Sequence, residues 1–130
     1  MPIISEVQLE HNLLLNVVKG VLTASDVLEG YGGIGDLPGF HPGLNIVWDF
    51  RLAELDGLTG EDIRRIEEHI RQSPHPSFLP HKIAFVAERD VMFGLARMYQ
   101  GLAREQEVKI NVFRSMDEAL LWLDGRNKPV

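Results

Sequence analysis

The sequence predicts one α/β domain over residues 1–130, with a mixed β-sheet of four or five strands packed with four helices. Three observations predict it. Two alternating stretches open the chain as a hairpin, nearly continuous apolar runs follow, and helix-start signals separate the strands. The expected order is β-β-α-β-α-β-α-β-α, in which each strand–helix–strand unit crosses over right-handed and makes its strands parallel.

The N-terminal hairpin is indicated by two stretches in which apolar and polar residues alternate. Ile3, Val7 and Leu9 alternate with Ile4, Glu6, Gln8 and Glu10, which gives the period of two that is typical of a strand with one wet face. Residues 10–12 (Glu-His-Asn) predict a tight turn. Residues 13–17 continue the alternation, so we expect a second strand that pairs with the first.

Four segments carry signals for the start of a helix. Three have Ser or Thr with an acid three residues later, namely 23–26, 59–62 and 115–118. The hydroxyl accepts hydrogen bonds from free backbone N–H groups, and the acid favours the positive end of the helix. Only Ser115 with Glu118 is a full match to the capping box, which takes Glu or Gln at that position. Asp90 is predicted to cap the remaining helix in the same way.

Two apolar runs, residues 44–50 and 82–87, are nearly continuous, as in strands buried on both faces of a parallel sheet. Val108, Ile110 and Val112 alternate more openly and predict an edge or half-covered strand. The later helices are amphipathic, and in the first of them we expect Glu67 on the charged outer face, with Glu61, Arg64, Arg65, Glu68 and Arg71. Their apolar stripes are Ile63, Ile66 and Ile70, then Leu95, Met98, Tyr99 and Leu102, then Ala119, Leu120 and Leu123. We expect the Met and Tyr of the second stripe to lie in the core.

Composition argues against several classes of function. The chain has 19 acidic and 13 basic residues and a net charge of −6, which argues against a nucleic acid partner. It has no cysteine, which excludes disulfides, thiolate catalysis and cysteine-based zinc sites. No apolar run approaches the roughly 20 residues of a membrane span, and the N-terminus lacks the pattern of a signal peptide. We therefore expect a cytoplasmic protein without a cofactor.

A glycine pattern resembles a nucleotide-binding loop without its context. Gly30, Gly32 and Gly35 satisfy G-x-G-x-x-G, but that fingerprint follows a strand and opens a helix. Here the glycines follow a predicted helix, and Pro38 and Pro42 prevent another helix from starting. The pattern is better explained as a glycine-rich helix exit and loop.

No metal or nucleophile pattern is present. The five histidines form neither H-x-x-x-H nor H-E-x-x-H, and they are His11, His41, His69, His75 and His81. His75 and His81 flank two prolines in one loop, where we expect them to be solvated. No serine has a G-x-S-x-G context. We predict no metal site and no catalytic residue.

Polar residues follow the first buried strand. We expect Asp49 to end that strand, followed by Phe50 and Arg51. In open α/β sheets, ligands bind beyond the carboxyl ends of the strands. The residues expected there are Asp49, Arg51, Glu54, Asp56 and Thr59. Two interpretations stay open: a ligand or interaction site at Asp49 and Arg51, or a structural role in which Asp49 caps a turn and Thr59 caps a helix. An enzyme that uses Asp49, Arg51 and a histidine is the third alternative.

Four segments together resemble the bacterial SpoIIAA-like group, the STAS/SEC14-type domains. They are VLTASDVLE (21–29), IVWDFR (46–51), VMFGLARMYQ (91–100) and VFRSMDEALLWL (112–123). The resemblance covers nearly the whole chain and implies a mixed sheet packed against helices. STAS relatives resemble anti-sigma-factor antagonists, which bind a partner kinase and are switched by phosphorylation of a serine in a Ser-Gly context.

The resemblance implies a modification or partner site at Thr59 and Gly60, at the start of the helix after the central strand. A helix N-terminus favours a phosphate. This sequence departs from the pattern, because it has Thr in place of Ser and because Glu61 and Asp62 follow at once. Two acids there disfavour a phosphate.

The SEC14-like side of the resemblance implies an apolar or lipid-like ligand between the third helix and the sheet. The residues that would line such a pocket are Phe40, Phe78, Met92, Phe93, Met98 and Tyr99. The alternative is that they fill the core. The main prediction is a non-enzymatic regulatory module that binds a protein partner and forms a homodimer, with an exposed apolar patch near a helix or a sheet edge.

Overall fold

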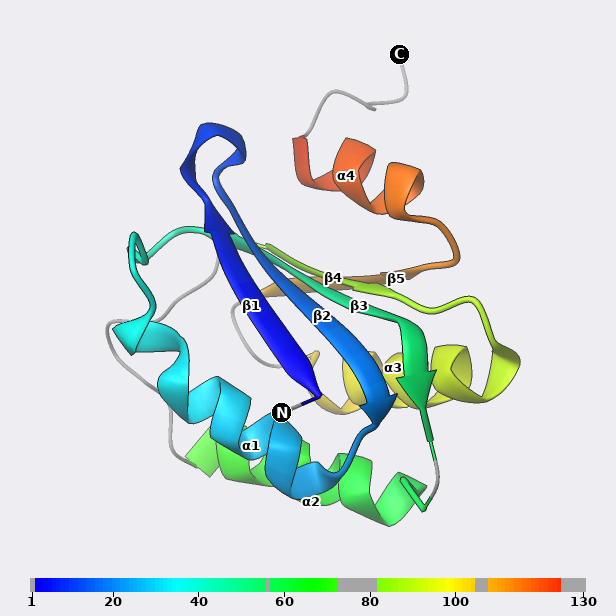
Figure 1. Cartoon of the computed structure of the whole chain (residues 1–130). Coiled ribbons are helices and arrows are strands. Elements are labelled where there is room, and N and C mark those ends of the chain that lie inside the picture. The colour runs from blue at the N-terminus through cyan, green and yellow to red at the C-terminus, as the bar shows by residue number, and fades with distance from the viewer. Residues whose placement is uncertain (1, 56, 73–81, 105–107, 125–130) are drawn as a thin grey trace.

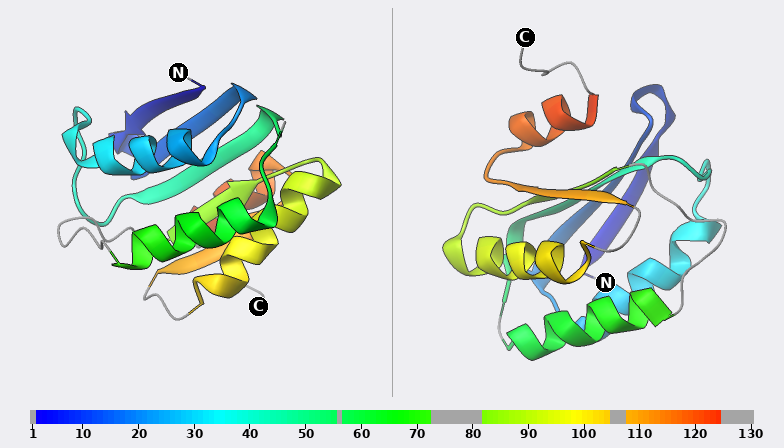
Figure 2. Two further views of the ribbon diagram at one scale, coloured as in Figure 1. Left: turned by 90° about the horizontal axis from the view of Figure 1, so that it is seen from below. Right: turned by 180° about the vertical axis from the view of Figure 1, so that it is seen from behind.

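The computed structural model describes residues 2–55, 57–72, 82–104 and 108–124. In this part of the chain a five-stranded sheet has three helices on one face and a fourth helix on the other (Figures 1 and 2). The strands are β1 (Ile3–Gln8), β2 (Leu13–Val21), β3 (Asn45–Glu54), β4 (Lys82–Val86) and β5 (Lys109–Phe113). The helices are α1 (Ala24–Gly33), α2 (Gly60–Gln72), α3 (Asp90–Leu102) and α4 (Met116–Asp124), with short 3-10 helices η1 (Leu9–His11) and η2 (Ile34–Asp36).

The sheet follows the order of the chain, β1-β2-β3-β4-β5. β1 is antiparallel to β2, and the other three pairs are parallel. The predicted mixed sheet with an N-terminal hairpin is therefore confirmed. Each parallel strand is added on the same side of the one before, so right-handed crossovers place α1, α2 and α3 on one face. α4 follows the last strand and packs on the opposite face (Figure 2).

The hydrophobic core consists of two clusters of unequal size, one on each face of the sheet. The large cluster lies under α1, α2 and α3, and β2 contributes Leu14 and Val18 to it, both fully buried. The small cluster lies under α4 and includes Leu13, Ala119 and Leu123, with Leu15 packed at its margin. Leu14 and Leu15, neighbours on β2, thus serve opposite faces, as strand geometry requires.

The helix caps form where the sequence predicted them, but in different detail. Thr23 accepts a hydrogen bond from the backbone N–H of Asp26 at 3.2 Å, and the Asp26 carboxylate accepts one from the Thr23 N–H at 3.1 Å. Thr59 and Asp62 make the same reciprocal pair, at 3.3 and 2.9 Å. The expectation that only Ser115 with Glu118 matches the box is wrong, because aspartate completes it at both threonines.

The predicted cap at Asp90 is also wrong. Asp90 is the first residue of α3, and the cap position is Arg89, which makes no side-chain cap hydrogen bond. The Asp90 carboxylate instead accepts a hydrogen bond from Arg114 at 2.7 Å. An acid in the first turn still faces the positive end of the helix dipole. Asp90 therefore marks the start of the helix correctly, although it is the first helical residue and not the cap.

Two further expectations need adjustment. Glu67 belongs to the charged face predicted for α2, yet it is buried and pairs with Arg71 at 3.2 Å. The reason is that α2 packs against both α1 and α3, which widens its buried side. The glycines predicted to form a loop after the helix are partly helical, because α1 extends to Gly33. Gly30 also lets α1 approach β1, since a Cβ at this position would come within 3.3 Å of Ile3.

Candidate functional site

The carboxyl edge of the sheet is uneven, because β2 and β3 extend past β4 and β5. Asp49 is in register with Val86, the last residue of β4, and Val86 is in register with Phe113, the last residue of β5. The expectation that Asp49 ends its strand is therefore wrong: β3 continues to Glu54 and stays paired with β2. Asp49 nevertheless lies level with the carboxyl ends of β4 and β5, where the strand-end rule places ligand sites.

A β-bulge orients the side chains at this point. Asp49 pairs with Val17 and Leu52 pairs with Lys19, so that Phe50 and Arg51 together oppose a single residue of β2. The extra residue keeps both Phe50 and Ala53 in the large core cluster although they are three positions apart. Asp49 and Arg51 consequently share the other face of the sheet.

Asp49 and Arg51 form a closed ion pair. Asp49 is buried, and its two oxygens accept hydrogen bonds from Nε and Nη2 of Arg51, each at 2.9 Å. The backbone N–H of Arg51 donates to the same carboxylate at 3.1 Å. The hydrogen bond from Asp49 raises the pKa of the Arg51 guanidinium, while burial acts in the opposite direction. Both oxygens of Asp49 are thus engaged in holding Arg51.

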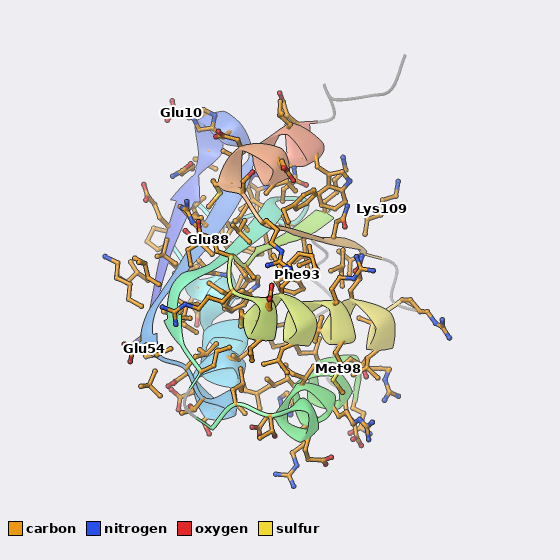
Figure 3. All side chains as sticks on the ribbon, turned by 90° about the vertical axis from the view of Figure 1, so that its right-hand side faces the viewer. Glu10, Glu54, Glu88, Phe93, Met98 and Lys109 are labelled. Atoms are coloured by element: carbon orange, nitrogen blue, oxygen red, sulfur yellow. The ribbon has the colours of Figure 1, made fainter. Side chains whose placement is uncertain are left out.

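A second charged group joins β5 to α3. Arg114 follows β5, and its Nη1 donates to the backbone carbonyl of Glu88 at 2.9 Å and to the Asp90 carboxylate at 2.7 Å. Its guanidinium also lies 4.1 Å from the centroid of the Phe93 ring, a cation–π contact. Figure 3 shows Glu88 and Phe93 on this edge, where the chain passes from β4 into α3. Arg114 was not among the site residues predicted from the sequence, where the available signal was its place directly after a strand.

Val91 is the large apolar side chain with the greatest exposure in the described part of the chain, at 67%. It is the second residue of α3 and directly follows Asp90, which pairs with Arg114. An exposed apolar residue next in sequence to a paired charge is compatible with the core and rim of a protein interface. We use "carboxyl-edge surface" for Arg51, Glu88, Asp90, Val91 and Arg114.

Thr59 and Gly60 lie at the start of α2, against α3. A Cβ on Gly60 would come within 3.4 Å of the sulfur of Met98, so the glycine allows the two helices to approach. The exposed Thr59 hydroxyl accepts from the Asp62 N–H and donates to the Asp62 carboxylate at 3.1 Å. A phosphate on Thr59 would displace this bond and face the Asp62 charge. The structural role predicted for Thr59 as a helix cap is confirmed.

The residues predicted for an apolar pocket lie among the core side chains. Met92 is buried, and four others are partly buried and packed against the large cluster, namely Phe40, Phe93, Met98 and Tyr99. Tyr99 meets Phe85 edge-on with ring centroids 5.7 Å apart, and Phe85 is 5.9 Å from Phe50. Met98 and Phe93 lie along α3 in Figure 3. Phe78 is outside the described residues. The alternative ligand site therefore requires space that these side chains occupy.

Among the described residues, no group of three or more His, Asp or Glu side chains is arranged to hold a metal ion. His75, His81 and Asp56 lie outside that part of the chain. His11, His41 and His69 are exposed and come from three separate elements or loops.

No helix in the described ranges is both long and apolar enough to cross a membrane.

Comparisons with known proteins add a fold likeness. The chain matches no known family profile and no curated protein. It is similar to the crystal structure of an uncharacterized protein of the DUF3478 family, with a SpoIIAA-like fold, from Shewanella loihica PV-4. The two share 17% sequence identity with a TM-score of 0.55, over 93% of this chain and 91% of that one. This likeness spans nearly the whole of both chains, and the chain therefore has a SpoIIAA-like fold.

Proposed function

We propose that this chain is a non-enzymatic regulatory module that binds a protein partner at its carboxyl-edge surface. The observation that carries the proposal is Val91, a strongly exposed apolar side chain at the start of α3, directly after Asp90, which pairs with Arg114. Interfaces are organised in this way, with an apolar anchor at the centre and polar residues at the rim.

The pairing of the charges favours binding over catalysis. A general acid or base must be free to exchange a proton with a substrate. Asp49 has both oxygens committed to Arg51, and Asp90 receives Arg114 at 2.7 Å. The same bonds hold the two arginines in place, and a fixed arginine loses less freedom when it meets a partner.

The two arginines also indicate the chemistry of the partner. Their side chains are 38% and 49% exposed, so each keeps N–H groups directed to water. A guanidinium carries five donors. The pairs described above use two N–H groups of Arg51 and one nitrogen of Arg114. The matching partner surface presents an apolar side chain or pocket for Val91 with carboxylates beside it.

The test is a binding measurement on a partner recovered by affinity purification from the source organism. Its dissociation constant is measured by calorimetry with wild type, Val91→Glu and Leu102→Glu. Leu102 lies at the opposite end of α3 and is 39% exposed, so its variant is a matched control. We expect Val91→Glu to weaken binding at least about tenfold and the control to leave it unchanged.

Two results would overturn the proposal. One is a partner that binds Val91→Glu as tightly as wild type. The other is turnover of a substrate by the purified protein that is lost on Asp49→Asn. That result would establish the enzyme alternative.

A further inference from the structure

The two outer strands of the sheet differ in how their backbone groups are satisfied. β1 and β5 lie at opposite edges, since the sheet order follows the chain (Figure 2). Each has a neighbouring strand on one side only, so alternate residues direct their N–H and C=O groups away from the sheet. Another strand can pair with such an edge, and proteins normally block it. The fate of these outward groups decides which edge is open.

The outer edge of β5 is blocked by side chains. The Phe113 carbonyl accepts a hydrogen bond from the residue that follows β4, so Ile110 and Val112 direct their backbone groups outward. Nε2 of Gln100 on α3 donates to the Ile110 carbonyl at 2.8 Å, and the Val112 N–H donates to the side chain of Asn111 at 2.9 Å. A strand that approached β5 would have to displace both bonds.

The outer edge of β1 has no such block. The Pro2 carbonyl accepts a hydrogen bond from the Lys19 N–H on β2 at 2.8 Å, and the register is unbroken from there to the end of β1. Even-numbered residues therefore bond to β2, and Ile3, Ser5 and Val7 direct their N–H and C=O groups outward. Within the described part of the chain these outward groups have no hydrogen-bond partner. β1 also lacks the proline, lysine or bulge that protects an edge.

We propose that β1 pairs with β1 of a second copy of this chain, antiparallel and with a two-fold axis at Ser5. In this register Ser5 lies opposite Ser5 of the second copy, and Ile3 lies opposite Val7 at both ends. Each of these pairs exchanges two hydrogen bonds, so every outward group of both strands is satisfied. The two sheets then become one continuous sheet.

Neighbouring registers satisfy less of the edge. Pairing centred on Glu6 places two glutamates opposite each other, which is unfavourable, and it carries Ile3 past the end of the opposing strand. Pairing centred on Ile4 leaves Val7 beyond the opposing strand in the same way. The register centred on Ser5 avoids both losses, because it places Glu6 opposite Ile4 of the second copy.

The side chains of β1 also suit this register. Ile3 and Val7 pack against the large core cluster and are only partly buried. Pairing brings Ile3 of one copy beside Val7 of the other and extends that cluster across the contact. On the opposite face Ile4 is 54% exposed, and it would pack against the methylene groups of Glu6.

The difference between the edges supports a closed pair of copies. A contact about a two-fold axis uses the same edge of both copies. Since β5 is blocked, β1 is the open edge among the described strands, and two copies cover both open edges. A sheet with two open edges would continue to add copies.

This inference does not rest on the proposed function. Val91 lies on α3, outside the contact, so Val91→Glu should leave the mass in solution unchanged whether or not it loses the protein partner. The two proposals can therefore fail independently.

Molecular mass in solution is the first test. Sedimentation equilibrium of wild type should give twice the chain mass of 14.7 kDa. Ser5→Pro removes an outward N–H and keeps the bonds to β2, since an edge strand accepts proline where its N–H faces outward. It should raise the dissociation constant of the dimer at least about tenfold. Ser5→Ala is the matched control: both variants lose the bond from the Ser5 hydroxyl to Asn16, but only Ser5→Ala keeps the N–H and should dimerise as wild type does.

A pair of charged variants tests the register without altering the backbone. Ile4→Glu places an acid opposite Glu6 at both ends of the contact and should raise the dissociation constant at least about tenfold. Ile4→Lys places a cation there and should dimerise at least as tightly as wild type. Because Ile4 is exposed, both variants should fold, as circular dichroism checks. Equal weakening by both variants would contradict this register.

Amide hydrogen exchange, followed by NMR, locates the contact. The N–H groups of Ile3 and Val7 should exchange slowly in the wild-type dimer and fast in Ser5→Pro, because pairing is what protects them. Three results would overturn the proposal. They are a wild type that stays monomeric at micromolar concentration, a dimer in which these two amides exchange as fast as in Ser5→Pro, and a strand of a different protein paired with β1.

Discussion

The two faces of the sheet differ in what covers them. Under α1, α2 and α3 the side chains form a large cluster in which Leu14 and Val18 are fully buried. Under α4 the cluster is small, and Ile4 and Leu52 beyond it are more than half exposed. The first face is covered as a consequence of chain connectivity, because each crossover deposits a helix there. In the described part of the chain the second face receives only α4, which leaves apolar residues such as Leu52 exposed.

The largest effect should come from removing a buried side chain on the first face. Leu14→Ala should lower the free energy of unfolding by about 2–5 kcal/mol, because it removes buried methyl groups and leaves a cavity. Leu52→Ala, an identical change at an exposed position on the other face, should cost less than about 0.5 kcal/mol. Urea unfolding at low protein concentration measures both. Equal losses would remove the distinction between the faces.

A smaller loss should follow from breaking the ion pair at the carboxyl edge. Arg51→Ala leaves the buried Asp49 carboxylate without its two side-chain donors, and we expect a loss of about 1–3 kcal/mol, since Arg51 is partly exposed to water. Asp49→Asn should be milder, because it removes the buried charge together with the attraction. Urea unfolding of wild type and both variants measures these losses. If Arg51→Ala leaves the free energy of unfolding unchanged, the ion pair does not contribute to stability.

The pH dependence of this pair has a definite sign. The pKa of Arg51 is raised in the folded protein, so its contribution is fully present below the unfolded pKa and is lost only as the pH rises past the folded one. That window lies in strong alkali. Between neutral and mildly alkaline pH, the difference in unfolding free energy between wild type and Arg51→Ala should therefore stay constant. If this difference in unfolding free energy shrinks over that range, a titrating group other than Arg51 is responsible for it.

The smallest predicted change is at the helix caps. Thr59→Ala and Thr23→Ala each remove a hydroxyl that accepts a backbone N–H, at 3.3 and 3.2 Å, and each should cost about 1 kcal/mol. The two caps have the same geometry, so thermal unfolding should give similar shifts. A much larger loss at Thr59 would indicate that its bond to Asp62 has a role beyond capping.

The elements with local signals could be predicted from the sequence. Caps mark the start of three helices, and strict alternation or continuous apolar runs mark the strands, so the order of elements and the mixed sheet followed. The extension of β3 past Asp49 could not be predicted, because Asp49 and Arg51 interrupt the apolar run and no local pattern marks a bulge. Both charges are accommodated only because they pair with each other across the extra residue.

The remaining errors involve contacts between distant segments. Asp90 was expected to cap a helix, but its carboxylate bonds to Arg114, 24 positions away in the chain. Glu67 was expected in water, but α2 lies between two other helices. Such contacts depend on how elements pack, and a single sequence records only what each element prefers alone.

One measurement tests the proposed partner surface most directly. Sedimentation velocity is run on the recovered partner mixed with wild type, Val91→Glu or Leu102→Glu. We predict that wild type and Leu102→Glu bind the partner and that Val91→Glu does not. A Val91→Glu protein that binds the partner as wild type does would contradict the proposal.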